Sequence, residues 1–193
     1  MDVRSLIRTL LVALVSVGLV ILVIVLLVKG LSGPGGAPTN HTNVGKYGDT
    51  NAVAGLLIDG YTNLDQNHRQ VKITVSATQS EIDVIQGYQG NVIASQSYPS
   101  NSAAYTQFLQ SLQLVGFSRG SKANIDPRGY CPAGDRYTYS FNDGRTDLFS
   151  YWSTSCGGQG TFQGSSLQVR QLFERQVPPA DLSRLTGDTG VIL

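Results

Sequence analysis

Apolar and polar residues alternate over residues 71–77, and again over 82–84 and 91–98. A period of two is typical of strands that bury one face. Turn-forming residues at 78–80 and 87–90 separate the three stretches. Because connections this short join antiparallel neighbours, the pattern predicts a three-stranded antiparallel meander.

Two later stretches repeat apolar residues every three or four positions, which predicts helices with one buried stripe. The first follows the capping residues 100–102 and ends at Gly116, and we expect Phe117 to pack back on it. The second follows Ser165–Ser166 and ends before Pro178–Pro179. The apolar positions are Tyr105, Phe108, Leu109, Leu112 and Val115 in the first helix, and Leu167, Val169, Leu172 and Phe173 in the second.

Between the helices, residues 136–141 and 148–154 alternate again around Asn142-Asp143-Gly144. Asp-Gly between alternating stretches is a strong hairpin signal, because glycine tolerates the positive φ of a type I′ turn. The order strands, helix, strands, helix predicts an α+β fold, with one antiparallel sheet and two helices packed on one of its faces.

A different pattern precedes this domain, because Thr9–Val28 is an unbroken run of twenty residues without charge. Such a helix spans about 30 Å, the thickness of the hydrocarbon core of a bilayer. The run is longer than the apolar core of a signal peptide, although Gly30–Ser32 offers a possible cleavage site. Arg4 and Arg8 precede the span, which predicts residues 1–8 in the cytoplasm and the rest of the chain outside.

Composition divides the part of the chain that follows the span. Residues 29–50 are rich in Gly, Pro, Asn and Thr and predict a flexible stalk. Residues 51–179 form the predicted extracytoplasmic domain, and residues 180–193 are interpreted as a loose tail. Residues 30–193 contain eleven Lys and Arg against twelve Asp and Glu, a net charge of −1. This balance argues against nucleic acid as a partner, which a basic face would recognise.

The hairpin turn predicts a disulfide between the two cysteines. With Asp143-Gly144 as a two-residue turn, residues whose numbers add up to 287 face each other, and Cys131 and Cys156 satisfy this rule. They fall at a non-hydrogen-bonded pair, where the Cα atoms are about 4.5 Å apart, close enough for a disulfide. Closing this loop is worth about 3–3.5 kcal/mol on the chain-entropy model. The bond requires an oxidising compartment and so supports the extracytoplasmic placement.

The same register sorts the hairpin aromatics between two faces of the sheet. Tyr137, Tyr139 and Trp152 fall with the sulfur atoms on the apolar face and are interpreted as core. Phe149 and Tyr151 fall on the polar face. Exposed aromatic residues often mark recognition surfaces, so these two are the candidate binding platform, unless a helix or loop covers them.

Catalytic motifs and groups of His, Cys, Asp and Glu with metal-ligand spacing are not evident in the sequence, which predicts no metal and no cofactor. The alternative is a sortase-like cysteine transpeptidase, because Ser153-Thr154-Ser155-Cys156 is similar to the threonine-before-cysteine pattern of sortases. In that hypothesis Cys156 is the nucleophile, His68 the base and Arg170 the third active-site residue. It requires a free thiol at Cys156, which the predicted disulfide withholds.

Three segments, residues 87–99, 151–164 and 172–178, together resemble single-span bacterial envelope proteins with a small cysteine-paired ectodomain. The resemblance implies a setting in the bacterial cell envelope and assigns no activity. We therefore expect a single-pass protein of the plasma membrane, anchored in the lipid bilayer by Thr9–Val28. Its extracytoplasmic domain is expected to bind another protein or a surface polymer, or to be part of an envelope complex, without being an enzyme.

Overall fold

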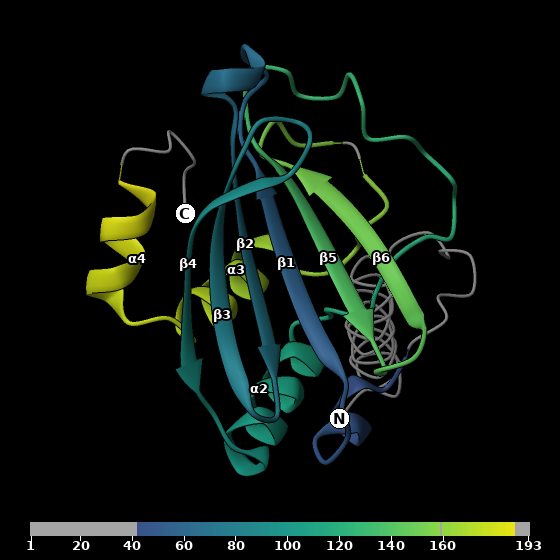
Figure 1. Ribbon diagram of the computed structural model, residues 1–193. Coiled ribbons are helices and arrows are strands. Elements are labelled where there is room, and N and C mark those ends of the chain that lie inside the picture. The colour runs from purple at the N-terminus through teal and green to yellow at the C-terminus, as the bar shows by residue number, and fades with distance from the viewer. Residues whose placement is uncertain (1–41, 159, 188–193) are drawn as a thin grey trace, which may run out of the picture. The chain divides into compact units, whose positions relative to one another are not determined.

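Six strands form one antiparallel sheet in the order β4-β3-β2-β1-β5-β6, with three α-helices packed around it (Figure 1). The computed structural model describes residues 42–158 and 160–187. The strands are β1 (Val53–Asp59), β2 (Arg69–Ser76), β3 (Gln79–Gln86), β4 (Asn91–Pro99), β5 (Arg136–Asn142) and β6 (Asp147–Thr154). The helices are α2 (Ser102–Leu114), α3 (Ser166–Glu174) and α4 (Pro179–Thr186), with 3-10 helices η1 (Val44–Tyr47) and η2 (Asp65–Asn67). The architecture confirms the predicted α+β class and the antiparallel sheet.

Strand β1 is the element that the sequence prediction lacks, and it lies at the centre of the sheet. It pairs with β2 on one side and with β5 on the other, both antiparallel. β1 therefore lies between the predicted meander β2-β3-β4 and the predicted hairpin β5-β6 and joins them into one sheet. The register places Leu56 opposite Ile73 on β2 and Tyr139 on β5.

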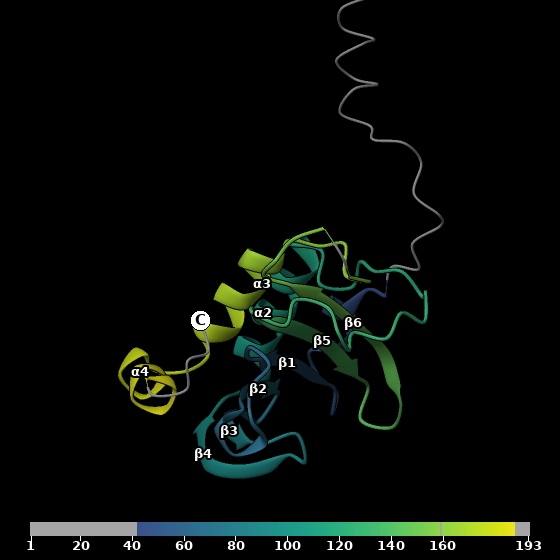
Figure 2. The ribbon, with the colours of Figure 1, turned by 90° about the horizontal axis from the view of Figure 1, so that it is seen from above.

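One face of the sheet, the core face, is covered by α2 and α3, which lie on the same side of it (Figure 2). Because side chains alternate along a strand, every second residue of β1 points to this face. Strand residues of the core include Ala54, Leu56, Ile58, Val71, Ile73, Val75, Tyr139 and Phe141, and helix residues include Tyr105, Leu109, Leu112, Val169 and Phe173, all nearly or fully inaccessible. The opposite face, the second face, carries mostly polar side chains, as is common for antiparallel sheets.

Helix α2 begins and ends as the sequence predicts. The Asn101 side chain accepts a hydrogen bond from the Ala104 amide (3.0 Å), which caps the first turn. Gly116 adopts a left-handed φ of 81°, and the Phe117 amide donates to the Leu112 carbonyl (3.0 Å). Phe117 is fully buried, so the chain packs back on the helix as expected.

The ends of the domain differ from the prediction. Val44–Tyr47, placed in the stalk by composition, forms η1, and Val44 is fully buried in the core. Residues 180–186, interpreted as tail, belong to α4, whose first residue is Pro179. Helix α3 already ends at Glu174, and Pro179 begins α4, because the fixed φ of proline suits a first helical turn.

The predicted membrane span, Thr9–Val28, lies outside the described residues. Within residues 42–158 and 160–187, the helices are too short and too polar to cross a bilayer. The chain divides into two units, 1–39 and 40–193, and all described residues belong to the second.

The position of β1 predicts unequal effects for two adjacent leucines. Leu56→Ala leaves a cavity in the core and should lower the free energy of unfolding by about 2–5 kcal/mol. Leu57→Ala, on the second face and partly exposed, should lower it by about 1 kcal/mol or less. Urea unfolding followed by circular dichroism measures both, and equal losses would contradict the register of β1.

Candidate functional site

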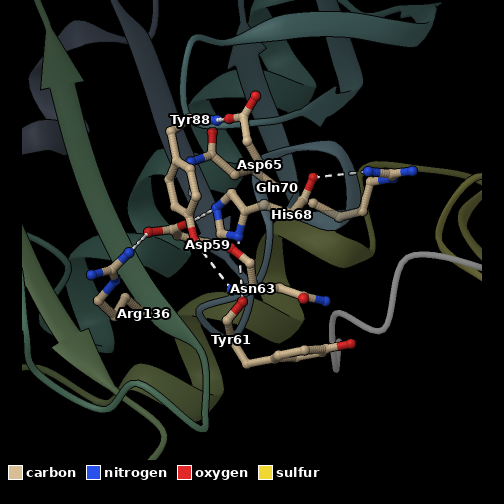
Figure 3. A network of polar contacts seen from close by, with 9 residues as sticks. Asp59, Tyr61, Asn63, Asp65, His68, Gln70, Tyr88 and Arg136 are labelled. Carbon is tan, nitrogen blue, oxygen red and sulfur yellow. Dashed lines mark hydrogen bonds and ion pairs between the residues drawn. The ribbon is translucent and has the colours of Figure 1, made fainter.

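A network of polar side chains lies at the end of the sheet where β1 ends (Figure 3). The register sets its geometry, because Asp59, the last residue of β1, faces Gln70 on β2 and Arg136 on β5. All three side chains point to the second face, since they occupy the same row of the sheet. His68, just before β2, approaches the same carboxylate.

The Asp59 carboxylate accepts hydrogen bonds from three side chains. Oδ1 accepts from His68 Nε2 (2.7 Å) and from Gln70 Nε2 (3.0 Å). Oδ2 forms a close ion pair with the Arg136 guanidinium. The side chains of His68, Asp59 and Arg136 are 0%, 14% and 16% exposed. A carboxylate shielded to this degree depends on its donors, because an unpaired buried charge is costly.

Tyr88, in the turn between β3 and β4, covers the imidazole of His68. The two rings are stacked, with centroids 4.0 Å apart and an interplanar angle of 15°. The Tyr88 hydroxyl donates to the Asn63 carbonyl (2.9 Å) and accepts from the Asn63 amide (3.1 Å). The Tyr88 amide donates to Asp65 Oδ1 (2.8 Å). These bonds join the β1–β2 connection to the β3–β4 turn and hold Tyr88 in place.

The contacts of His68 define what this network does chemically. One ring nitrogen faces Asp59, and Nδ1 faces the Tyr61 carbonyl at 3.3 Å. Both nitrogens are thus engaged with protein oxygens, and Tyr88 lies over the ring. A general base needs a ring nitrogen directed at the substrate proton. The arrangement is that of a structural tie between strand ends.

The sequence prediction missed this network for two reasons. His68 lies in the polar run Asn67-His68-Arg69, which gives no sign of burial, whereas its side chain is fully buried. Asp59 ends a strand that was not predicted. The signal that would have found Asp59 is the alternation of Ala52, Ala54, Leu56 and Ile58 directly before it.

The predicted disulfide between Cys131 and Cys156 is confirmed, with a Cα–Cα distance of 5.7 Å. The register used to derive it was wrong, because the pairs from Arg136–Thr154 to Phe141–Phe149 add up to 290, an offset of three, before an irregularity at Asn142. The turn contains four residues, Asp143–Thr146, and Asp143 Oδ1 accepts from the Arg145 and Thr146 amides. The cysteines lie beyond the ends of both strands, where Asp135 and Ser155 continue the pairing by a backbone hydrogen bond of 2.9 Å.

The offset of three residues moves the candidate platform to the other face. Phe149 lies opposite Phe141, and Tyr151 lies opposite Tyr139, on the core face. They are 7% and 6% exposed, and Phe149 makes an edge contact with Phe117 (ring centroids 5.3 Å apart). The prediction of an exposed surface at Phe149 and Tyr151 was therefore wrong. Trp152, assigned to the core by the sequence, instead points to the second face.

The residues of the sortase alternative have separate partners. Cys156 is in the disulfide, and His68 is bound to Asp59. The Arg170 guanidinium on α3 lies over the ring of Tyr137, 4.5 Å from its centroid, and donates to its hydroxyl (3.2 Å). Burial raises the pKa of Tyr137, while the nearby Arg170 charge opposes the rise. Within the described part of the chain, neither a hydrogen bond nor an ion pair joins any two of these three residues.

Apolar side chains gather at the same end of the sheet as the network. Eight large apolar side chains are exposed among the described residues, and five come from the β1–β2 connection and the β3–β4 turn with the start of β4. These five residues, Tyr61, Leu64, Tyr88, Val92 and Ile93, are called the end patch, and the consecutive β4 residues Val92 and Ile93 point to opposite faces of the sheet. The hydrogen bonds of Tyr88 to Asn63 and Asp65 hold the two contributing segments together. Groups of three or more metal-ligating side chains are absent from residues 42–158 and 160–187.

The Asp59 network predicts a loss of stability when its central charge is removed. Asp59→Asn leaves Arg136 and His68 facing a neutral amide, and should lower the free energy of unfolding by about 1–3 kcal/mol. The matched control is Asp83→Asn on β3, opposite the exposed Lys72, which should change it by about 0.5 kcal/mol or less. Urea unfolding at neutral pH compares the two, and similar losses would contradict the role of Asp59.

Comparison with known proteins identifies no relative, because neither a protein-family model nor a curated protein matches the chain. The resemblance to single-span bacterial envelope proteins stays a prediction. The function has to be inferred from the residues and contacts of the chain.

Proposed function

We propose that this chain is a single-pass membrane protein that displays a non-enzymatic binding domain outside the cytoplasm. Thr9–Val28 is the anchor in the lipid bilayer, and the disulfide-closed α+β domain is the displayed part. The partner is a protein of the cell envelope. The observation that carries the proposal is the Cys131–Cys156 disulfide, read together with the apolar run that precedes the domain.

The disulfide supports an extracytoplasmic location, because such bonds persist in oxidising compartments and are rare in the cytoplasm. Both cysteines of the sequence are in the bond. A reactive thiol at Cys156, which the sortase alternative requires, is absent while the bond is intact. The engaged nitrogens of His68 likewise favour binding over proton-transfer catalysis.

The end patch supports a protein partner. Clusters of exposed aromatic and aliphatic side chains with polar neighbours are typical of protein interfaces. The patch is also pre-organised, since the bonds of Tyr88 order it before any partner arrives. The chain enters the domain through η1, near the start of β1, and the patch lies at the opposite end of the sheet (Figure 1).

The proposed location predicts the redox state of the cysteines in cells. The full chain is expressed in a bacterial host, and intact cells are treated with a membrane-permeant maleimide before lysis. We expect Cys131 and Cys156 to stay unmodified unless a reductant is added first, because the bond forms where the domain is displayed. External protease on spheroplasts should remove the domain and spare a cytoplasmic marker. Alkylation of both thiols in unreduced cells would overturn the proposed location.

The proposed interface predicts which surface touches the partner. A photoreactive amino acid is placed at Leu64 in the end patch, and at Leu167 on α3 as a control of similar exposure (66% and 57%). Irradiation of whole cells should give a discrete protein adduct from Leu64 and none from Leu167. Adducts of equal yield at both positions would contradict the end patch as interface. A heterogeneous, protease-resistant adduct would instead identify a surface polymer and overturn the protein partner.

A further inference from the structure

A long loop between α2 and β5 wraps around β6, the strand at one edge of the sheet. Gly120 packs against the ring of Tyr151 on the core face, where an added Cβ would lie 2.4 Å from the ring. Further on, Ile125 and Tyr130 contact Trp152, which points to the second face. Figures 1 and 2 both show this loop passing on the outer side of β6. Loops of this length without regular structure commonly have a function of their own.

The loop explains why Trp152 is only 6% exposed on a face that α2 and α3 leave uncovered. Its indole nitrogen donates to the Ile125 carbonyl (3.0 Å), and the ring of Tyr130 lies 5.3 Å from it, centroid to centroid. Ile125 itself is exposed, as are most residues from 122 to 129. The loop is thus a thin cover with little contact beneath it other than Trp152.

The disulfide attaches this loop covalently to the segment that follows β6. Cys131 directly follows Tyr130 in the loop, and Cys156 lies just past the end of β6. Two hydrogen bonds also tie this end, one from the Thr62 amide to the Pro132 carbonyl (2.8 Å) and one from the Asp135 amide to Ser155 Oγ (2.9 Å). Without the disulfide, the Cys131 end of the cover would be held by these hydrogen bonds and by the contacts of Ile125 and Tyr130 with Trp152, while the far end of the loop stays tied by the Ser121 amide, which donates to the Thr161 carbonyl (2.8 Å). Hydrogen bonds of this kind each contribute only modestly to stability.

The hairpin itself does not depend on the disulfide. The pairing of β5 and β6 runs from Asn142 and Asp147 to Arg136 and Thr154, inside the cysteines. Beyond it, the Ser155 amide donates to the Asp135 carbonyl (2.9 Å). Opening of the bond therefore frees the residues before Asp135, whereas the strands keep their ladder.

Of the two cysteines, Cys156 is the more exposed residue. Cys156 is exposed, whereas Cys131 is half-buried and is the one non-glycine residue with positive φ (53°) among those described. Gly157 and Gly158 follow Cys156, and a Cβ built on either would meet no atom within 4 Å. An attacking thiolate needs such open access to the sulfur.

From these observations we infer that the Cys131–Cys156 disulfide is a clasp that an external dithiol opens, and that opening uncovers Trp152 without unfolding the domain. A thiolate of the dithiol attacks Cys156 Sγ, the bond to Cys131 Sγ breaks, and Cys131 leaves as a thiolate that takes up a proton. The second thiolate of the dithiol attacks the mixed disulfide and releases Cys156. The protein gains two electrons and two protons, and the dithiol becomes a disulfide. The inference goes beyond the proposed display function and does not depend on the anchor or the partner.

The experiment uses the fluorescence of Trp152, the one tryptophan of the sequence. The full chain in detergent micelles is titrated with dithiothreitol, and alkylation followed by mass spectrometry counts the free thiols. As the two thiols appear, we expect the emission of Trp152 to move to longer wavelength and its quenching by acrylamide to increase. The far-UV circular dichroism spectrum should stay unchanged, because the sheet and helices persist.

Two variants serve as controls. Cys131→Ser with Cys156→Ser should show the fluorescence of the reduced protein and no response to dithiothreitol. Tyr130→Ala with the disulfide intact should raise acrylamide quenching by removing part of the cover, and reduction should raise it further. Emission that stays unchanged after both thiols are alkylated would overturn the clasp, because the loop would be held without it. Loss of the circular dichroism signal in step with reduction would overturn it too, because the bond would then hold the whole fold.

Discussion

The pairing of β1 with both β2 and β5 is the constraint on which the rest of the domain depends. β1 is the strand that connects the meander to the hairpin, and its buried residues are shared by both halves of the core. The cost of ordering a non-local strand pair has to be recovered from apolar burial and from the two ladders together. The helices follow from this, because α2 and α3 cover a core face that exists only when β1 is in place.

Asp59 extends the constraint from the core to the end of the sheet. Its carboxylate lies between Gln70 and Arg136 because the two ladders of β1 are in register at that row. A slip of one residue in either ladder would turn the partner side chain to the core face. The ion pair with Arg136 and the bond to His68 thus depend on strand register. Any other register would leave the shielded charge of Asp59 unpaired and would be less stable for that reason.

The sequence predicts elements well where a single local rule decides them, and less well where two segments have to be aligned. Period-two alternation found β2 to β6, and apolar spacing with Asn101 and Gly116 found α2. β1 was missed because its interior glycine, Gly55, weakens the alternation. A glycine is needed at this position, because a Cβ on Gly55 would lie 2.5 Å from the Oγ of Ser140 on β5. α4 was missed because Pro179 was interpreted only as the end of a helix.

In the β5–β6 hairpin, an error in the predicted turn length changed the predicted face of several side chains. Asp143-Gly144 was predicted as the whole turn, whereas the Asp143 side chain closes a four-residue turn by hydrogen bonds to amides. The resulting offset is odd, so the side chains from Phe149 to Thr154 changed face relative to β5. Phe149 and Tyr151 moved into the core, and Trp152 moved out of it.

The placement of Trp152 on the second face has a further consequence. A large aromatic ring on an open sheet face needs a cover, and a thin loop can supply one only if something holds it there. The Cys131–Cys156 disulfide closes a loop that contains the β5–β6 hairpin, whose strands are already paired. It therefore adds little to the order of the hairpin in the folded state. In the folded protein the disulfide restrains residues outside the ladder, and these residues cover the ring of Trp152. The same covalent bond thus stabilises the domain against unfolding and decides whether one aromatic side chain meets solvent.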